Sequence, residues 1–408
     1  MNGLSDVQEI REGLLSEPEA RTRIGSGSLV ALRTSGSPVL VGPGSLVKVN
    51  TSIGCSRAAD LAVEVEKITA LGGLGYQPDL MMDLSTVRLP TPLYRTAGEQ
   101  LGLPVGTLPH YLCFKPRRGI DVPLLLDEIE RQAASGVAWM TLHLSPTREM
   151  YELARVTRQT ATTARGGGIV VRDMLIHDRA ESVLAERFGD IAAILERHGV
   201  ALSLGTTFRP ASTVDALDAV HIQELERQQM FYREARALGV PTMLEAVGHM
   251  RLGQIGAFTR LLRGKLGYPG PVMTLGPIPT DAAVGNDHIA NALGAGMLAV
   301  EGGTDVVNSV TREEHTGRVP GLDSILEGLR AARIAAHSAN ISLFPDLDFP
   351  AENQMTENRG ANYTCVVDGG LFEKSARNRF AMGCTRCGNE CPLLVNFVTD
   401  REEKASRT

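Results

Sequence analysis

The 408-residue sequence lacks several features that mark whole classes of protein. It has no apolar run long enough to cross a bilayer, which argues against a membrane protein. Its formal net charge is -6, whereas a surface that binds nucleic acid normally needs a basic stripe. The opening residues, MNGLSDVQEI, lack the basic region and apolar core of a secretory signal. We therefore expect a cytoplasmic protein that binds neither membranes nor nucleic acids.

Cysteine is also scarce, with six residues in the chain. Cys55, Cys113 and Cys365 are scattered, and the other three lie within the segment GCTRCGNECP. An extracellular disulfide framework would spread its cysteines along the chain. In a reducing compartment, a tight group indicates a metal or redox site before it indicates a disulfide.

The sequence is rich in short apolar runs that alternate with amphipathic stretches of helical length. Strands that alternate with helices pair in parallel, and eight such units predict a closed (β/α)8 TIM barrel of class α/β. The alternative is an open doubly wound sheet. The predicted strands are 46–54, 80–85, 103–110, 137–145, 168–176, 200–206, 240–248 and 271–278.

Polar residues gather where these predicted strands end. In a (β/α)8 barrel the chemistry is located at the carboxyl ends of the strands, in the loops that follow them. The residues at or just beyond these ends are Asn50, Asp83, Ser85, His110, Tyr111, His143, Arg172, Asp173, Arg209, Glu245, His249, Asp281, Asp287 and His288. Any one of them could be a structural polar group, but their recurrence predicts a polar site at the barrel mouth.

The clustered cysteines have the spacing C-x2-C-x3-C, formed by Cys384, Cys387 and Cys391. Three thiolates cannot complete a structural tetrahedral zinc site without a fourth ligand, and no histidine follows His337. Three thiolates suit a [4Fe-4S] cluster with one iron left open, which can bind S-adenosylmethionine and cleave it to a carbon radical. The alternative is a zinc knuckle that borrows a distant His or Asp.

These patterns divide the chain into three parts: an N-terminal segment (1–45), a catalytic barrel (46–338), and a linker with a cluster domain (339–408). The first part contains an expected hairpin around SLVALRTSGSPVLVGPG. The stretch PDLDFPAENQMTENRGANYT is typical of a linker or irregular loop. The cluster tail could serve its own barrel or that of a partner.

Motifs in order along the chain resemble a known family. They are KVNTSIG, MDLST, VGTLPHY, TLH, RGG, SLG followed by RP, E-x-x-GH, TLGP-x-x-TD, DHI and EEH-x-G. The same order is found in phosphomethylpyrimidine synthase, the radical S-adenosylmethionine enzyme that makes the thiamin pyrimidine. 5-Hydroxybenzimidazole synthase is its close relative. The resemblance covers about residues 45–340 and the cysteine triad, and this chain is similar to the short form of the family.

The resemblance implies a (β/α)8 barrel with a C-terminal cluster, usually a homodimer, acting on 5-aminoimidazole ribonucleotide. It implies zinc or iron on His249 and His315, and a reductant such as flavodoxin or ferredoxin. Glu245 and His143 are the implied proton-transfer groups. The implied nucleotide contacts are Asn50, Met82, Tyr111, His143, Arg165, Gly166, Arg209, Glu245 and Met273. The run TARGGG (163–168) also offers unobstructed backbone amides to a phosphate.

Several positions depart from the family pattern. The triad is one residue shorter than the usual C-x2-C-x4-C. Ala164 stands where the family has serine, Thr206 where it has aspartate, and Met273 where it has tyrosine. Ala246 and Val247 replace a Gly-Pro pair. An unpaired buried polar group costs about 1–3 kcal/mol. One ligand therefore does not suit the residues of the family pattern and the residues of this chain equally well.

We therefore keep three functional hypotheses. The first is radical rearrangement of 5-aminoimidazole ribonucleotide or a close analogue, with either the thiamin pyrimidine or a cobamide benzimidazole as product. The second is a non-catalytic nucleotide-binding paralogue. The third is a zinc lyase or hydrolase that uses His249 and His315 without radicals.

Overall fold

The computed structural model describes residues 3–74, 77–160 and 162–360, together with Leu371, Cys387, Glu390, Cys391 and Pro392. The chain forms two compact units. The larger comprises Met1–Gly73 and Gln77–Leu343, and the smaller comprises Leu74–Tyr76 and Phe344–Thr408. In the smaller unit the described helix is α14 (Pro350–Gly360). None of the described helices is long and apolar enough to span a membrane.

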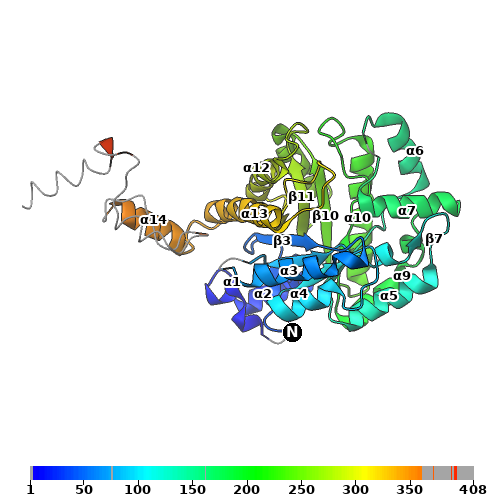
Figure 1. Cartoon of the computed structure of the whole chain (residues 1–408), viewed down its shortest axis with the longest axis horizontal. Helices are drawn as coiled ribbons and strands as arrows, with labels where there is room; N and C mark the ends of the chain where they lie inside the picture. The colour runs from blue at the N-terminus through cyan, green and yellow to red at the C-terminus, as the bar shows by residue number, and fades with distance from the viewer. Residues whose placement is uncertain are drawn as a thin grey trace, which may run out of the picture. The chain divides into compact units, whose positions relative to one another are not determined.

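The larger unit is built on a closed barrel of eight parallel strands, which confirms the predicted fold (Figure 1). Around the barrel the order of strands follows the order of the chain, with β12 pairing back onto β3. The strands are β3 (Lys48–Ile53), β4 (Leu80–Asp83), β5 (Val105–Thr107), β8 (Trp139–Leu142), β9 (Ala201–Leu204), β10 (Thr242–His249), β11 (Val272–Ile278) and β12 (Val306–Asn308).

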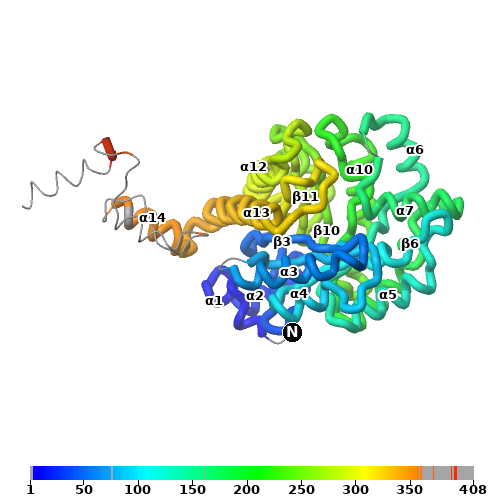
Figure 2. The backbone as a smooth tube through the Cα atoms, in the orientation of Figure 1, coloured from blue at the N-terminus to red at the C-terminus, as the bar shows by residue number. Residues whose placement is uncertain are grey.

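Helices between successive strands cover the outside of the barrel, as the tube in Figure 2 shows. Several begin at a capping side chain: Asp121 accepts from the Leu124 N–H, and Asp218 accepts from the His221 N–H. The main helices are α3 (Leu61–Gly72), α4 (Leu93–Leu101), α5 (Val122–Ala134), α6 (Arg148–Thr157), α7 (Arg165–Ile176), α8 (Val183–Glu186), α9 (Phe188–His198), α10 (Ala219–Ala237), α11 (Ile255–Thr259), α12 (Asp287–Val300) and α13 (Leu322–Leu343).

One predicted strand is wrong. Residues 168–176 belong to α7, and the missing strand is β12. The buried residues of α7 include Gly166, Val170 and Met174, a spacing of four that places them on one helical face. Arg172 and Asp173 are therefore helical and do not end a strand. Asp173 is buried and accepts a hydrogen bond from the Ile120 N–H at 2.7 Å.

The N-terminal segment belongs to the same unit as the barrel. Its helices are α1 (Gln8–Arg11) and α2 (Glu17–Ser26). The expected hairpin is present as β1 (Val30–Leu32) and β2 (Val39–Val41), which pair antiparallel. Its apolar side chains join the core cluster that contains Trp139 and Met243 inside the barrel. At the other end of the unit, α13 runs to Leu343, past the predicted boundary at 338.

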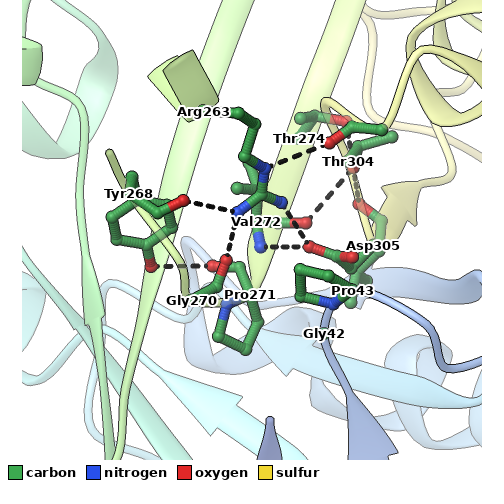
Figure 3. A network of polar contacts seen from close by, with 12 residues as sticks. Gly42, Pro43, Arg263, Tyr268, Gly270, Pro271, Val272, Thr274, Thr304 and Asp305 are labelled. Carbon is green, nitrogen blue, oxygen red and sulfur yellow. Dashed lines mark hydrogen bonds and ion pairs between the residues drawn. The ribbon is translucent and has the colours of Figure 1, made fainter. Parts of the chain in front are cut away.

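A polar network supports the amino-terminal ends of β11 and β12 (Figure 3). The Arg263 guanidinium donates to Asp305 Oδ2 at 3.0 Å and to the Gly270 carbonyl at 2.6 Å. The same carboxylate accepts from the Val272 N–H at 2.8 Å. Burial raises the pKa of Asp305, and Arg263 opposes the shift. The network therefore fixes the two strands at the end of the barrel away from the polar strand ends.

Candidate active site

A cavity of about 440 Å³ lies at the carboxyl ends of the barrel strands. Its walls combine residues from β3, β4, β10, β11 and β12 with the loops that follow other strands. Among the predicted nucleotide contacts, those that line it are Met82, Tyr111, His143, Arg165, Gly166, Arg209 and Glu245. Residues more than 160 positions apart in the sequence thus share one cavity, as a barrel mouth requires.

Two predicted contacts lie outside this lining. Asn50 is fully buried and donates from Nδ2 to Asn308 Oδ1 at 2.6 Å. Asn308 itself lines the cavity, a position that the sequence pattern did not single out. Met273 is paired in register with Glu245 but packs in the apolar cluster inside the barrel. Both therefore lie outside the cavity lining, each beside a residue that belongs to it.

His143 lies in a fixed position on the cavity wall. Its Nδ1 is 3.0 Å from Thr207 Oγ1. Gly166 and Gly205 flank the ring: a Cβ on Gly166 would lie 2.5 Å from His143 Nε2, and one on Gly205 would lie 2.9 Å from Cε1. Burial lowers the pKa of His143 well below its ordinary value, and His110 and Arg209 add to the effect. The imidazole is therefore neutral and can exchange a proton.

The glycine-rich run forms the first turn of α7. Ala164, Arg165 and Gly166 line the cavity, so the helix begins at its edge. The first N–H groups of a helix have no intrahelical partner and carry a partial positive charge, which favours an anion. Gly167 lets this turn approach the next loop, because a Cβ there would lie 2.4 Å from Thr207 Cγ2. This geometry agrees with the phosphate role inferred from TARGGG.

Two arginines bring positive charge to the same cavity. Arg209 Nη1 lies 3.3 Å from Glu245 Oε1, and the Arg165 guanidinium lies 5.3 Å from the centre of the Tyr111 ring. Burial raises the pKa of Glu245, while Arg209 opposes that shift. Glu245 is thus a half-buried carboxylate whose affinity for a proton exceeds that of an ordinary glutamate. A carboxylate with a raised pKa is a better proton acceptor than an ordinary one and can serve in general acid–base catalysis.

His249 and His315 come together from β10 and from the loop after β12, with ring centres 4.9 Å apart. Each ring contacts a carboxylate through Nδ1: His249 meets Asp281 at 2.7 Å, and His315 meets Asp287 at 2.8 Å. A carboxylate behind each imidazole is the usual support of a metal-binding histidine, leaving Nε2 for the ion. The described residues contain no group of three or more ligands, so metal binding here stays a prediction.

The strand that carries Glu245 and His249 is irregular between them. The register of β10 against β11 shifts between Val247 and His249. Val247 has φ 86°, a backbone conformation that β-branched residues seldom adopt. Bulges of this kind re-aim side chains next to functional sites. The strained backbone of Val247 thus lies between Glu245 and His249, the predicted metal ligand.

Thr206, where the family pattern has aspartate, does not present a free hydroxyl to the cavity. Its Oγ1 donates to the Glu245 carbonyl and accepts from Gln228 Nε2 at 3.0 Å. Glu224 holds the following residues, accepting from the Thr207 and Phe208 N–H groups at 2.6 Å each. The sequence pattern missed Thr207 and Glu224 because neither belongs to a recognisable motif.

The cysteine triad falls in the smaller unit. Cys384 lies outside the described residues. Cys387 is exposed and Cys391 is half-buried, and both are free thiols. The Glu390 N–H donates to the Cys387 carbonyl at 3.1 Å. Thiolates are the usual ligands of iron–sulfur clusters, and the three-thiolate cluster stays a prediction.

A closed (β/α)8 barrel with charged and proton-exchanging groups at its mouth defines an enzyme-like barrel protein. Comparison with known proteins gives the family: residues 6–396 match the Radical SAM ThiC family. The chain belongs to this family, which implies an iron–sulfur cluster and S-adenosylmethionine.

The relatives include three proteins named phosphomethylpyrimidine synthase. The one from Ignicoccus hospitalis is 34% identical, over 96% of this chain and 93% of its own. The one from Methanopyrus kandleri is 38% identical, over 81% and 78%. The one from Thermococcus kodakarensis is 31% identical, over 97% and 95%. The match to the family extends along nearly the whole chain.

Proposed function

We propose that this protein is a radical S-adenosylmethionine lyase that rearranges 5-aminoimidazole ribonucleotide, or a close analogue, into a phosphomethylpyrimidine. One observation carries the proposal. A single cavity joins a helix N-terminus and two arginines to a neutral imidazole and a half-buried carboxylate with a raised pKa. The helix N-terminus and the two arginines suit a phosphate, and the imidazole and the carboxylate suit proton transfer.

In this proposal each residue has a defined task. The α7 N-terminus and Arg165 hold the phosphate, with Arg209 nearby to balance the remaining charge. His143 and Glu245 exchange protons with the aminoimidazole. Tyr111 covers the ligand with an apolar face, and Met82 fills the wall beside it. Met82, Tyr111 and His143 are buried and would limit the access of water to the reacting atoms.

The cofactor would be held by Cys384, Cys387 and Cys391. This [4Fe-4S] cluster would pass one electron from the reductant to S-adenosylmethionine, whose C5′–S bond would break to give methionine and a 5′-deoxyadenosyl radical able to abstract hydrogen from the ribose. His249 and His315 would hold zinc or iron beside Glu245. Glu245 and His249 both lie on β10, and the centre of the His315 ring is 4.9 Å from that of His249. We also infer a homodimer, and electron supply from a protein such as flavodoxin or ferredoxin.

The test is anaerobic incubation of reconstituted protein with 5-aminoimidazole ribonucleotide, S-adenosylmethionine and a reductant, with products identified by mass. We expect 5′-deoxyadenosine and a phosphomethylpyrimidine. Glu245→Gln should lower product formation by about 10²-fold or more, because a positioned base contributes at least that much. Glu234→Gln, an exposed change on α10, is the matched control.

The outcomes separate the competing hypotheses. Abundant 5′-deoxyadenosine beside unchanged nucleotide would mean a different substrate. No 5′-deoxyadenosine from protein that holds an intact cluster would favour the non-catalytic paralogue. Activity that survives air and Cys384→Ala would favour the zinc lyase or hydrolase.

A second candidate is 5-hydroxybenzimidazole synthase, which uses the same nucleotide. The observation in its favour is Thr206, whose hydroxyl is occupied by the Glu245 carbonyl and Gln228. The cavity therefore lacks a carboxylate that the thiamin enzymes have at this position. Detection of a hydroxybenzimidazole in the same incubation would replace the first proposal with this one.

A further inference from the structure

His110 is a second histidine beside the cavity, with no role in the function proposed above. It follows β5 in the short helical turn Pro109–Leu112 and is fully buried. Its ring meets the His143 ring edge-on, with centres 5.6 Å apart, and the Tyr111 ring at 5.1 Å. It is therefore in contact with two residues that line the cavity, while its own ring lies behind them.

Neither ring nitrogen of His110 has a well-formed hydrogen bond within the described part of the chain, and the Gly166 backbone makes only a weak hydrogen-bond contact with the ring. Burial lowers the pKa of His110 to about 4, against a smaller opposing effect of the Gly166 backbone. The ring is thus neutral near pH 7, with one nitrogen a donor and the other an acceptor. Buried polar groups rarely stay unpaired, because losing the hydrogen bonds of water is costly.

Two buried hydroxyl groups, on the neighbouring strands β8 and β9, also have no hydrogen-bond partner among the described residues. Thr141 on β8 and Ser203 on β9 are fully buried, are paired in register, and have Oγ atoms without a partner among the described residues. Side chains alternate along a strand. Trp139 and Ala201 belong to the core cluster inside the barrel, so Thr141 and Ser203, two positions further on, face the same interior.

Continuing this alternation, His143 follows Thr141 on the inner face of the barrel. Thr141 and Ser203 thus lie one layer below His143, and His110 lies beside it. Unpaired polar groups on or just after three adjacent strands, β5, β8 and β9, therefore lie under and beside the His143 ring. Buried water commonly pairs such groups when two to four polar partners converge.

We propose that His110 is a positioning residue for His143: together with Thr141 and Ser203 it holds enclosed water that fixes the orientation and tautomer of the His143 ring. The effect of His110 on turnover rests on the proposed function, whereas the hydrogen bonds that join His110, Thr141, Ser203 and the water do not. On the other side Thr207 meets His143 Nδ1, so the ring is held from two directions. The enclosed water would meet the other ring nitrogen, His143 Nε2, which lies beside Gly166 at the edge of the cavity.

The first test uses the wild-type protein in two measurements. A crystal structure should show ordered water bonded to His110 and to Thr141 or Ser203. Two-bond ¹H–¹⁵N spectra of histidine-labelled protein should show His143 in one neutral tautomer between pH 6 and pH 8. Direct hydrogen bonding of His110 to a bound nucleotide would overturn the positioning role, as would a dry site.

The second test compares His110→Phe with His110→Asn. Phenylalanine fills the space without hydrogen bonds, so His143 should populate both tautomers and kcat should fall about tenfold, with KM changed less than about threefold. Asparagine keeps a donor and an acceptor and should restore most of kcat and the single tautomer. His221→Phe is the matched control, because His221 is also buried and neutral but packs on Phe258, away from the cavity.

An unchanged His143 tautomer in His110→Phe would overturn the proposal, and so would failure of His110→Asn to restore it. If His110→Phe does not fold, His110→Asn and the ordered water in the wild-type crystal structure still test the positioning role of His110. The tautomer and the water are measured without turnover. Absence of product from 5-aminoimidazole ribonucleotide, with both signatures present, would therefore refute the proposed function and leave this inference standing.

Discussion

At the scale of single residues, the site depends on partners that short motifs do not reveal. The histidines of E-x-x-GH and EEH are visible in the sequence, but their carboxylates are not assigned to them there. Asp281 and Asp287 follow β11, whereas His249 ends β10 and His315 follows β12. Only the closed barrel brings these carboxylates to within 2.7 and 2.8 Å of the imidazoles.

This arrangement predicts a loss of metal affinity when one carboxylate is neutralised. Asp287→Asn should weaken zinc or iron binding about 10–100-fold, because a supporting carboxylate orients its imidazole and raises the basicity of the ring. Metal titration followed by elemental mass spectrometry measures the change. Asp323→Asn, an exposed change on α13, should bind as the wild type does. Equal affinity of all three proteins would argue against this metal site.

At the scale of elements, α7 shows where periodicity alone misleads. Residues 168–176 form a short apolar run that fits a buried strand or a buried helix equally well. The helix is settled by contacts that are distant in sequence: the Ala164 N–H donates to the Thr207 carbonyl at 2.7 Å, and Gly167 packs against Thr207. Conversely, β12 has three residues, too few for a pattern, and exists because β11 and β3 pair with it.

The close packing of α7 predicts that a single methyl group is harmful at its first turn. Gly167→Ala should destabilise the protein by about 1–3 kcal/mol, because the new Cβ would lie 2.6 Å from the Thr207 backbone, which cannot move freely. Gly189→Ala on α9 meets nothing within 4 Å and should stabilise by up to about 1 kcal/mol through helix propensity. Urea unfolding measures both, and similar values for the two would contradict this packing.

At the scale of the whole molecule, one buried carboxylate makes the stability of the folded barrel depend on pH. Glu224 on α10 is fully buried and holds the loop after β9 through two backbone N–H groups and the Ser145 hydroxyl. Burial raises the pKa of Glu224 to about 7, and these hydrogen bonds limit the shift. The folded protein therefore binds a proton at this site at pH values where the unfolded chain has lost it.

The sign of the pH dependence follows from this pKa. Because the folded pKa lies above the ordinary value of 4.5, the contribution of Glu224 to stability is greatest below that value and is lost as pH rises through about 7. The largest change is about 3 kcal/mol. Between pH 5 and pH 8, the melting temperature of wild type should fall relative to Glu224→Gln. Parallel pH profiles of the two proteins would refute this assignment, and Glu234→Gln serves as the surface control.

The sequence by itself determined the fold class, the order of seven strands, and the family. Each of these depends on local composition and on motifs whose order along the chain can be read directly. The tertiary structure decided which side chains share a cavity: it left Asn50 and Met273 outside the lining, added Asn308, and packed Thr207 and His110 against His143. Barrel closure causes the difference, because the register between strands fixes depth and neighbours, and register is a property of the whole ring.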